Sequence, residues 1–160
     1  MFVLGIDPGL SRLGYGIVEG THPPTAHLAG VISTSPESPT EVRLRELYAG
    51  LDELIAKTKP DAVAIESIFT NRNLQTAISV GRASGVAMLV AANHGLEVHE
   101  YVPTAVKRGV TGSGTADKKQ VQQMVARLLN LADVPSPADA ADALAVALCH
   151  LRAAPLKVRT

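Results

Sequence analysis

The chain has 160 residues, of which 46% are apolar, and its 15 basic residues balance its 15 acidic ones. A domain of this size buries enough apolar surface to fold without cross-links, so a disordered chain and a disulfide-stabilised miniprotein are both excluded. The single Cys149 favours a reducing, cytoplasmic location, we expect no membrane span or secretory leader, and the zero net charge removes the simplest argument for a polyanionic partner.

The first half of the chain predicts a three-stranded meander, then a helix and a fourth strand. Residues 2–7, 14–18 and 27–34 have strand patterns and are separated by turn-rich segments. Apolar residues recur at helical spacing over 41–59, and Pro60 ends this helix before a buried strand at 61–66.

The second half begins with a long helix, predicted over 73–93, that is rich in Ala and Gly and ends near Gly95. This helix is apolar over most of its circumference, so it is either buried within one subunit or contacts a second copy of the chain. The residues assigned to such a homodimer interface are Gly81, Gly85 and Met88.

The remaining elements complete one domain. A strand at 96–101, a short helix at 103–109, a loop at 111–114 and helices at 115–131 and 137–153 are predicted in this order. Together the elements indicate the α/β class, with a mixed five-stranded sheet sandwiched by helices. We expect a single domain over residues 1–153 and a short basic tail over 154–160.

Four carboxylates occupy positions that could form a site. Asp7 and Glu66 each end a predicted strand, and they share one edge of the sheet if the two strands are neighbours. Asp139 and Asp142 are three residues apart, on one face of the last helix. Asp139 could instead belong to a capping box that starts at Ser136. Asp142 lies in an Ala-rich run, where a charge is unfavourable unless it faces an opening or a cation.

Divalent cations would relieve the repulsion among such carboxylates. Mg²⁺ is the preferred candidate, with two ions per site and Mn²⁺ as an alternative, because a two-ion site can hydrolyse a phosphodiester. Zinc fits poorly, since the five histidines are scattered and Cys149 lacks companion ligands.

Phe69 stands in a polar stretch, where it could stack on an unpaired base or cover the start of the neighbouring helix. Basic residues elsewhere could contact DNA phosphates or form ordinary solvated surface. The candidates are Arg72, Lys107, Arg108, Lys118 and Lys119.

Several segments together resemble RuvC-type Holliday junction resolvases. They are residues 5–9 with 14–16, 64–66 followed by Phe69, 81–87, 106–107, 118–122 and 138–145. The resemblance implies a ribonuclease-H-like fold and a homodimer that nicks four-way DNA junctions symmetrically with Mg²⁺, in recombination and DNA repair. It also implies a partner complex of the RuvA/RuvB branch-migration type.

The resemblance assigns roles to individual residues. It implies catalytic, metal-binding acids at Asp7, Glu66, Asp139 and Asp142, a base-contacting aromatic at Phe69, and functional lysines at Lys107 and Lys118.

Three alternatives are less consistent with the sequence. Ribonuclease-H-like proteins of the RuvX/YqgF type usually lack the segment from Glu66 to Phe69 and the long small-residue helix. An actin-like nucleotide-binding protein has two lobes and needs a longer chain. A junction-binding protein without catalysis would carry four unneeded carboxylates on a surface that faces DNA.

Overall fold

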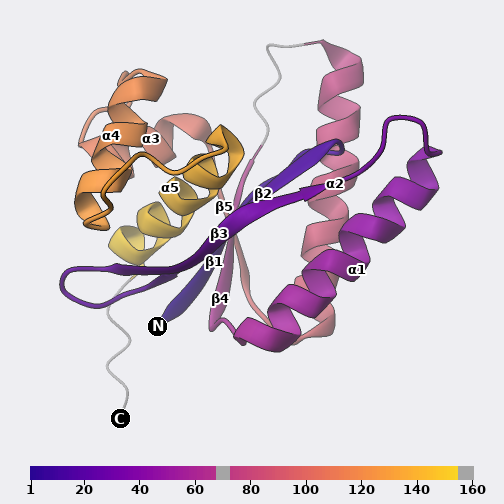
Figure 1. The fold of residues 1–160 in the computed structure, drawn as a ribbon, viewed down its shortest axis with the longest axis horizontal. Coiled ribbons are helices and arrows are strands. Elements are labelled where there is room, and N and C mark those ends of the chain that lie inside the picture. The colour runs from indigo at the N-terminus through magenta and orange to yellow at the C-terminus, as the bar shows by residue number, and fades with distance from the viewer. Residues whose placement is uncertain (68–72, 155–160) are drawn as a thin grey trace.

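The computed structural model describes residues 1–67 and 73–154, which form one mixed sheet with helices on both faces (Figure 1). The strands are β1 (Phe2–Asp7), β2 (Arg12–Glu19), β3 (Thr25–Ser33), β4 (Ala62–Glu66) and β5 (Val98–Tyr101). The helices are α1 (Thr40–Thr58), α2 (Leu74–Asn93), α3 (Pro103–Thr111), α4 (Lys118–Leu128) and α5 (Ala138–Ala153). The predicted order of elements and the predicted mixed sheet of five strands are confirmed.

The strands lie in the order β3-β2-β1-β4-β5. The first three form the expected antiparallel meander, whereas β4 pairs parallel with β1 and β5 pairs parallel with β4. Ile6 lies opposite Ile65 in this register. The next residues along the two strands, Asp7 and Glu66, therefore end at the same edge of the sheet.

Several element boundaries differ from the sequence prediction by up to three residues, and the starts of β2 and α4 are two that have a clear cause. β2 begins at Arg12, two residues earlier than expected, because this segment continues the pairing with β3 opposite Ser33. α4 begins at Lys118 instead of residue 115, because Asp117 and Gln120 form a capping box there.

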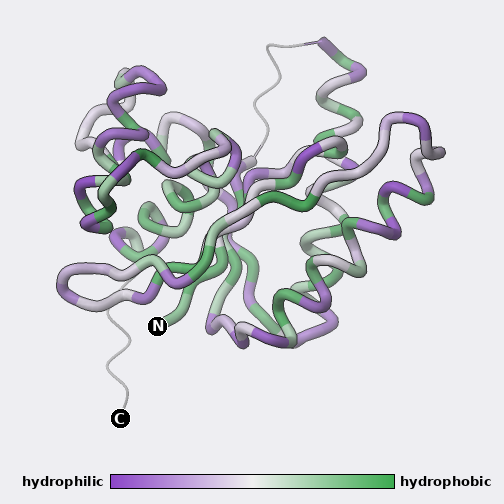
Figure 2. Tube along the Cα trace, in the orientation of Figure 1, coloured by the Kyte–Doolittle hydropathy of each residue, from purple (hydrophilic) through white to green (hydrophobic). Residues whose placement is uncertain are grey.

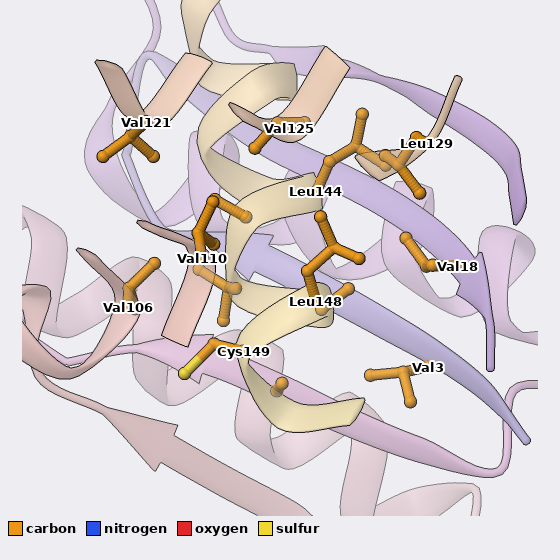
Figure 3. Close-up of a cluster of buried hydrophobic side chains, with 14 of the residues drawn as sticks. Val3, Val18, Val106, Val110, Val121, Val125, Leu129, Leu144, Leu148 and Cys149 are labelled. Atoms are coloured by element: carbon orange, nitrogen blue, oxygen red, sulfur yellow. The ribbon is translucent and has the colours of Figure 1, made fainter. Parts of the chain in front are cut away.

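The sheet separates two apolar cores. α1 and α2 cover one face, while α3, α4 and α5 cover the other (Figure 1). The central strands are mostly hydrophobic and α1 alternates between polar and apolar residues (Figure 2). In the second core, Leu144 and Leu148 of α5 lie among valines from the sheet and from α3 and α4 (Figure 3). α5 is thus the central helix of that core.

Three glycines bring α5 against the sheet. We call Gly5, Gly14 and Gly16 the glycine row; they lie on neighbouring strands β1 and β2, beneath α5. A Cβ atom at Gly5 would collide with the carbonyl oxygen of Ala143, and one at Gly14 would collide with the carbonyl oxygen of Asp139. Side chains at these positions would push the helix away, so the glycine row fixes the position of the α5 backbone.

α2 buries only one face against the sheet. Ala83, Ala87 and Val90 are buried, whereas Leu74 and Leu89 are more than half exposed, at 73% and 53%. We expected that no stretch resembles a membrane span. This expectation is wrong for α2, which is long and apolar enough to cross a membrane by length and composition. A core helix of a soluble protein passes the same test. No element formed by residues 1–67 and 73–154 covers the exposed apolar face of α2.

A candidate metal centre at the carboxyl ends of β1 and β4

Carboxylates from two strands and one helix converge at the edge of the sheet. Asp7, Asp139 and Asp142 each place an oxygen within 4.8 Å of the others. Glu66 ends β4 next to Asp7 at the same sheet edge, and its charge contributes to the raised pKa of Asp7. The structure therefore brings together all four acids that the sequence singled out; we call them the carboxylate site.

The geometry of the carboxylate site follows from two local features. Parallel pairing of β1 with β4 places Asp7 next to Glu66. The glycine row lets the first turns of α5 lie directly on β1 and β2, which brings Asp139 and Asp142 to the same edge.

Burial and mutual repulsion oppose the ionisation of the acids at this site when no cation is bound. Burial, followed by the charges of Glu66, Asp142 and Asp139, raises the pKa of Asp7 to about 8, while the charge of Lys118 acts in the opposite direction. Burial and the charge of Asp142 also raise the pKa of Glu66. Such shifts mark a place where a bound cation is favourable.

Two basic side chains partly neutralise the acids of α5. Lys118 donates a hydrogen bond from Nζ to Oδ2 of Asp142 at 3.1 Å. Burial alone would lower the pKa of Lys118, but Asp142, Asp7 and Asp139 raise it overall. The expectation that Asp142 faces an opening or a cation is therefore correct on both counts, since it also lines a cavity.

The other pair joins Arg12 of β2 to Asp139, with 3.5 Å between Nε and Oδ2. The interpretation of Asp139 as part of a capping box started by Ser136 is wrong. The N-cap of α5 is Pro137, which makes no side-chain capping hydrogen bond. Asp139 lies in the first helical turn, where the helix dipole favours a negative charge.

A cavity of about 460 Å³ opens beside the carboxylates. Asp7, Glu66 and Asp142 line one part of it, and Lys107 and Lys118 contribute positive charge. The rest of its wall is formed mainly by small apolar and hydroxyl side chains of α2, α3, α4 and α5 and the segments around them: Pro8, Ser67, Thr76, Ala77, Val80, Pro103, Val106, Val121 and Ala145. Its volume lies in the range typical of ligand sites.

The predicted DNA-contacting residues have different outcomes. Lys107 and Lys118 line the cavity, whereas Lys119 is exposed and does not. Phe69 and Arg72 lie outside the described residues, as does most of the predicted tail over 154–160. Of the residues assigned to a dimer interface, Gly81 and Gly85 lie on the exposed face of α2, and Met88 is half-buried against the core.

Sequence reasoning missed Arg12, which it placed before the second strand rather than in it. The period-two pattern was the available signal, because Arg12 precedes Gly14 by two residues and so shares its face of the strand.

The expectation that all histidines are scattered is wrong for two of them. The rings of His99 and His150 lie 4.5 Å apart, centroid to centroid, and Nδ1 of His150 is 2.6 Å from the hydroxyl of Tyr101. Burial, and then the neighbouring His99, lower the pKa of His150. Within residues 1–67 and 73–154, however, histidines take part in no group of three potential metal ligands.

Comparisons with known proteins show which family the chain resembles. A family model described as "Crossover junction endodeoxyribonuclease RuvC" matches residues 3–150. A protein of that name from Alkaliphilus oremlandii is 54% identical over 152 residues, covering 94% of this chain and 92% of its own length.

Two solved structures are also similar. One is described as "Thermus thermophilus RuvC structure", with a TM-score of 0.88 and 38% identity over 95% of this chain and 94% of that one. The other is "T. thermophilus RuvC in complex with Holliday junction substrate", with a TM-score of 0.91 and 37% identity over 96% and 94% of the two chains.

Proposed function

The chain belongs to the RuvC family of crossover junction endodeoxyribonucleases, with its ribonuclease-H-like fold, and we propose that it resolves Holliday junctions through the carboxylate site formed by Asp7, Glu66, Asp139 and Asp142. The convergence of these acids is the observation that carries the assignment of the site. The proposed product is a pair of symmetric nicks in a four-way DNA junction.

The donor set suits Mg²⁺, and Mn²⁺ as an alternative. All four side chains offer the hard oxygen ligands that these ions prefer, and the pKa of Asp7, raised by burial and by the neighbouring acids, supports a cation at this position. When bound, two such ions can activate a water and stabilise the leaving oxygen of an in-line phosphodiester displacement.

The other residues around the cavity bind and orient the DNA strand. Lys107 and Lys118 line the same cavity as the carboxylates, so their charges would offset those of an incoming phosphate. The apolar wall, which includes Val80 and Val106, limits water around that phosphate. Phe69 stays a predicted base-stacking residue, and Arg72 and Lys119 stay predicted phosphate contacts farther along the strand.

A homodimer would supply two carboxylate sites for the two strands to be cut. The exposed apolar face of α2 supports this assembly: Leu74, Ile78 and Leu89 are exposed, and a Cβ added at Gly85 would meet nothing within 4 Å. A two-fold symmetric protein suits a junction with two equivalent cleavage positions. A RuvA/RuvB-type partner complex, a cytoplasmic location and a single domain over residues 1–153 also stay predictions.

The test is incubation of the purified protein with a mobile four-way junction, a linear duplex and an RNA–DNA hybrid, each with and without Mg²⁺. Symmetric nicks confined to the junction and dependent on Mg²⁺ are expected. Cleavage of the hybrid alone would favour the RNA-directed alternative.

Asp7→Asn should abolish nicking while leaving junction binding intact, since it removes a ligand without adding bulk. Cleavage and binding are measured on the same labelled junction. Loss of binding together with cleavage would indicate a structural role for Asp7 instead.

A further inference from the structure

Arg12 occupies an unusual position beside the carboxylate site. It is the first residue of β2 and lies on the face of the strand that carries Gly14 and Gly16. Gly14 has no side chain, so the backbone of Asp139 packs closely against it. Arg12 therefore lies next to the first turn of α5. Its Nε is 3.5 Å from Oδ2 of Asp139, and its side chain is 56% exposed.

The ion pair between Arg12 and Asp139 resembles the contact between Lys118 and Asp142. Each acid that α5 contributes to the carboxylate site is thus held by a basic side chain of the chain itself. A divalent cation on Asp139 would repel the nearby guanidinium and take over its attraction to the carboxylate. An ion pair this exposed is worth little in solution, so Arg12 can leave it at low energetic cost.

We propose that Arg12 is a positioning residue with two partners: it holds Asp139 in the metal-free protein and contacts a DNA backbone phosphate once Asp139 binds a divalent cation. This inference rests on the proposed function. Within residues 1–67 and 73–154, Asp139 is the one carboxylate that forms an ion pair with Arg12. A released guanidinium would therefore find its next anion on the substrate, and a guanidinium can donate two parallel hydrogen bonds to a phosphate.

The first step is tested by titrating the free protein with Mn²⁺ in a calorimeter. Arg12→Gln should bind Mn²⁺ about three- to tenfold more tightly than the wild type, because a competing cation is gone. Arg45→Gln is the matched control, since it removes the same charge from an exposed position on α1 and should change nothing. In an Asp139→Asn background, Arg12→Gln should lose its effect. Unchanged or weaker Mn²⁺ binding by Arg12→Gln overturns the proposal.

The second step is tested by junction binding, measured by fluorescence anisotropy in Ca²⁺ and in EDTA. Ca²⁺ takes the same class of oxygen ligands. Arg12→Gln should weaken binding several-fold in Ca²⁺ and much less in EDTA, where Asp139 occupies the guanidinium. Arg12→Lys should restore part of the affinity, because it keeps the charge but not the paired donors. An equal loss in both conditions, or no loss, overturns the exchange of partners.

These outcomes are separate from those of the proposed function. The Mn²⁺ titration uses no DNA, and thermal unfolding checks that each variant is folded. If the wild type nicks junctions while Arg12→Gln matches it in both measurements, the role of Arg12 is wrong and the proposed function stands. A wild-type chain that binds no Mn²⁺ contradicts both.

Discussion

At the scale of single residues, Asp7 dominates the electrostatics of the carboxylate site. Its pKa is raised from 3.8 to about 8, so between these values the folded metal-free protein holds a proton that the unfolded chain releases. The folded state then binds more protons than the unfolded state, and the free energy of unfolding falls as pH rises through this window. The raised pKa of Glu66 acts in the same direction.

We therefore predict that the metal-free protein loses stability between pH 5 and pH 8, by up to about 4 kcal/mol. Asp7→Asn should flatten this dependence and be more stable than the wild type at pH 8, because it removes the charge without removing the side chain. Urea unfolding in EDTA at several pH values measures the pH dependence of the wild type and the stability difference between the two proteins.

The contribution of His150 to stability changes with pH in the opposite direction. The wild type must therefore be compared with Asp7→Asn to isolate the contribution of Asp7. Its pKa is lowered in the folded state, so its protonation favours the unfolded chain as pH falls below about 6.5. This contribution is shared by the wild type and the variant. Parallel pH profiles for the two proteins would contradict the assignment of the shift to Asp7.

The sequence located the acids of the site and Lys118, but not Arg12 and not which acid each basic residue contacts. Asp7 and Glu66 are recognisable because each ends a buried strand, and Asp142 because it interrupts an Ala-rich helix. The pairing of Arg12 with Asp139 and of Tyr101 with His150 joins segments far apart in the chain. Local patterns contain no information about such contacts, which depend on how closely α5 approaches the sheet.

At the scale of elements, the position of α5 depends on the glycine row. Gly5→Ala should destabilise the protein by about 1–3 kcal/mol, because the new methyl group meets the backbone of Ala143, which cannot move aside like a side chain. Gly50→Ala in α1 is the control, since its Cβ would meet only the flexible side chain of Ile32. Thermal unfolding with both variants gives the comparison, and equal stability would show that α5 does not need this close approach.

α2 is the second element whose role can be tested. Gly85→Gln should prevent the proposed homodimer from forming and leave a folded monomer, because it places a bulky polar group in the middle of the exposed apolar face. Analytical ultracentrifugation gives the mass and circular dichroism the fold. Ala49→Gln, on the exposed side of α1, is expected to leave the mass unchanged. A dimeric Gly85→Gln variant would place the interface elsewhere.

At the scale of the whole molecule, the balance of 15 basic and 15 acidic residues conceals a surplus of basic residues outside the carboxylate site. If the four acids of the carboxylate site bind cations, 15 − 4 = 11 acidic residues remain against 15 basic ones. The neutral sum therefore does not argue against a DNA partner. The order of elements and the mixed sheet could be predicted, because strand and helix periods are clear, whereas the exposed face of α2 required the packed structure.

Metal binding should stabilise the whole fold, since cations bind the folded state and the unfolded chain has no assembled site. We predict that Mg²⁺ raises the melting temperature by several degrees at pH 8, near the raised pKa of Asp7, and by less at pH 6, where protons compete more strongly for this carboxylate. Differential scanning calorimetry measures this, and Asp7→Asn should lose most of the increase. An equal increase in the variant would indicate a different Mg²⁺ site.

The burial of α5 has a consequence for local motion. Its residues from Ala143 to His150 are all buried, and the helix packs on four strands, so its amide hydrogens should exchange with solvent only when the whole domain unfolds. Asp139 and Asp142 stand in the first two turns of this buried helix. Two of the four carboxylates are thereby held in place before any cation or DNA strand arrives, so little ordering of these two ligands is left to the moment of binding.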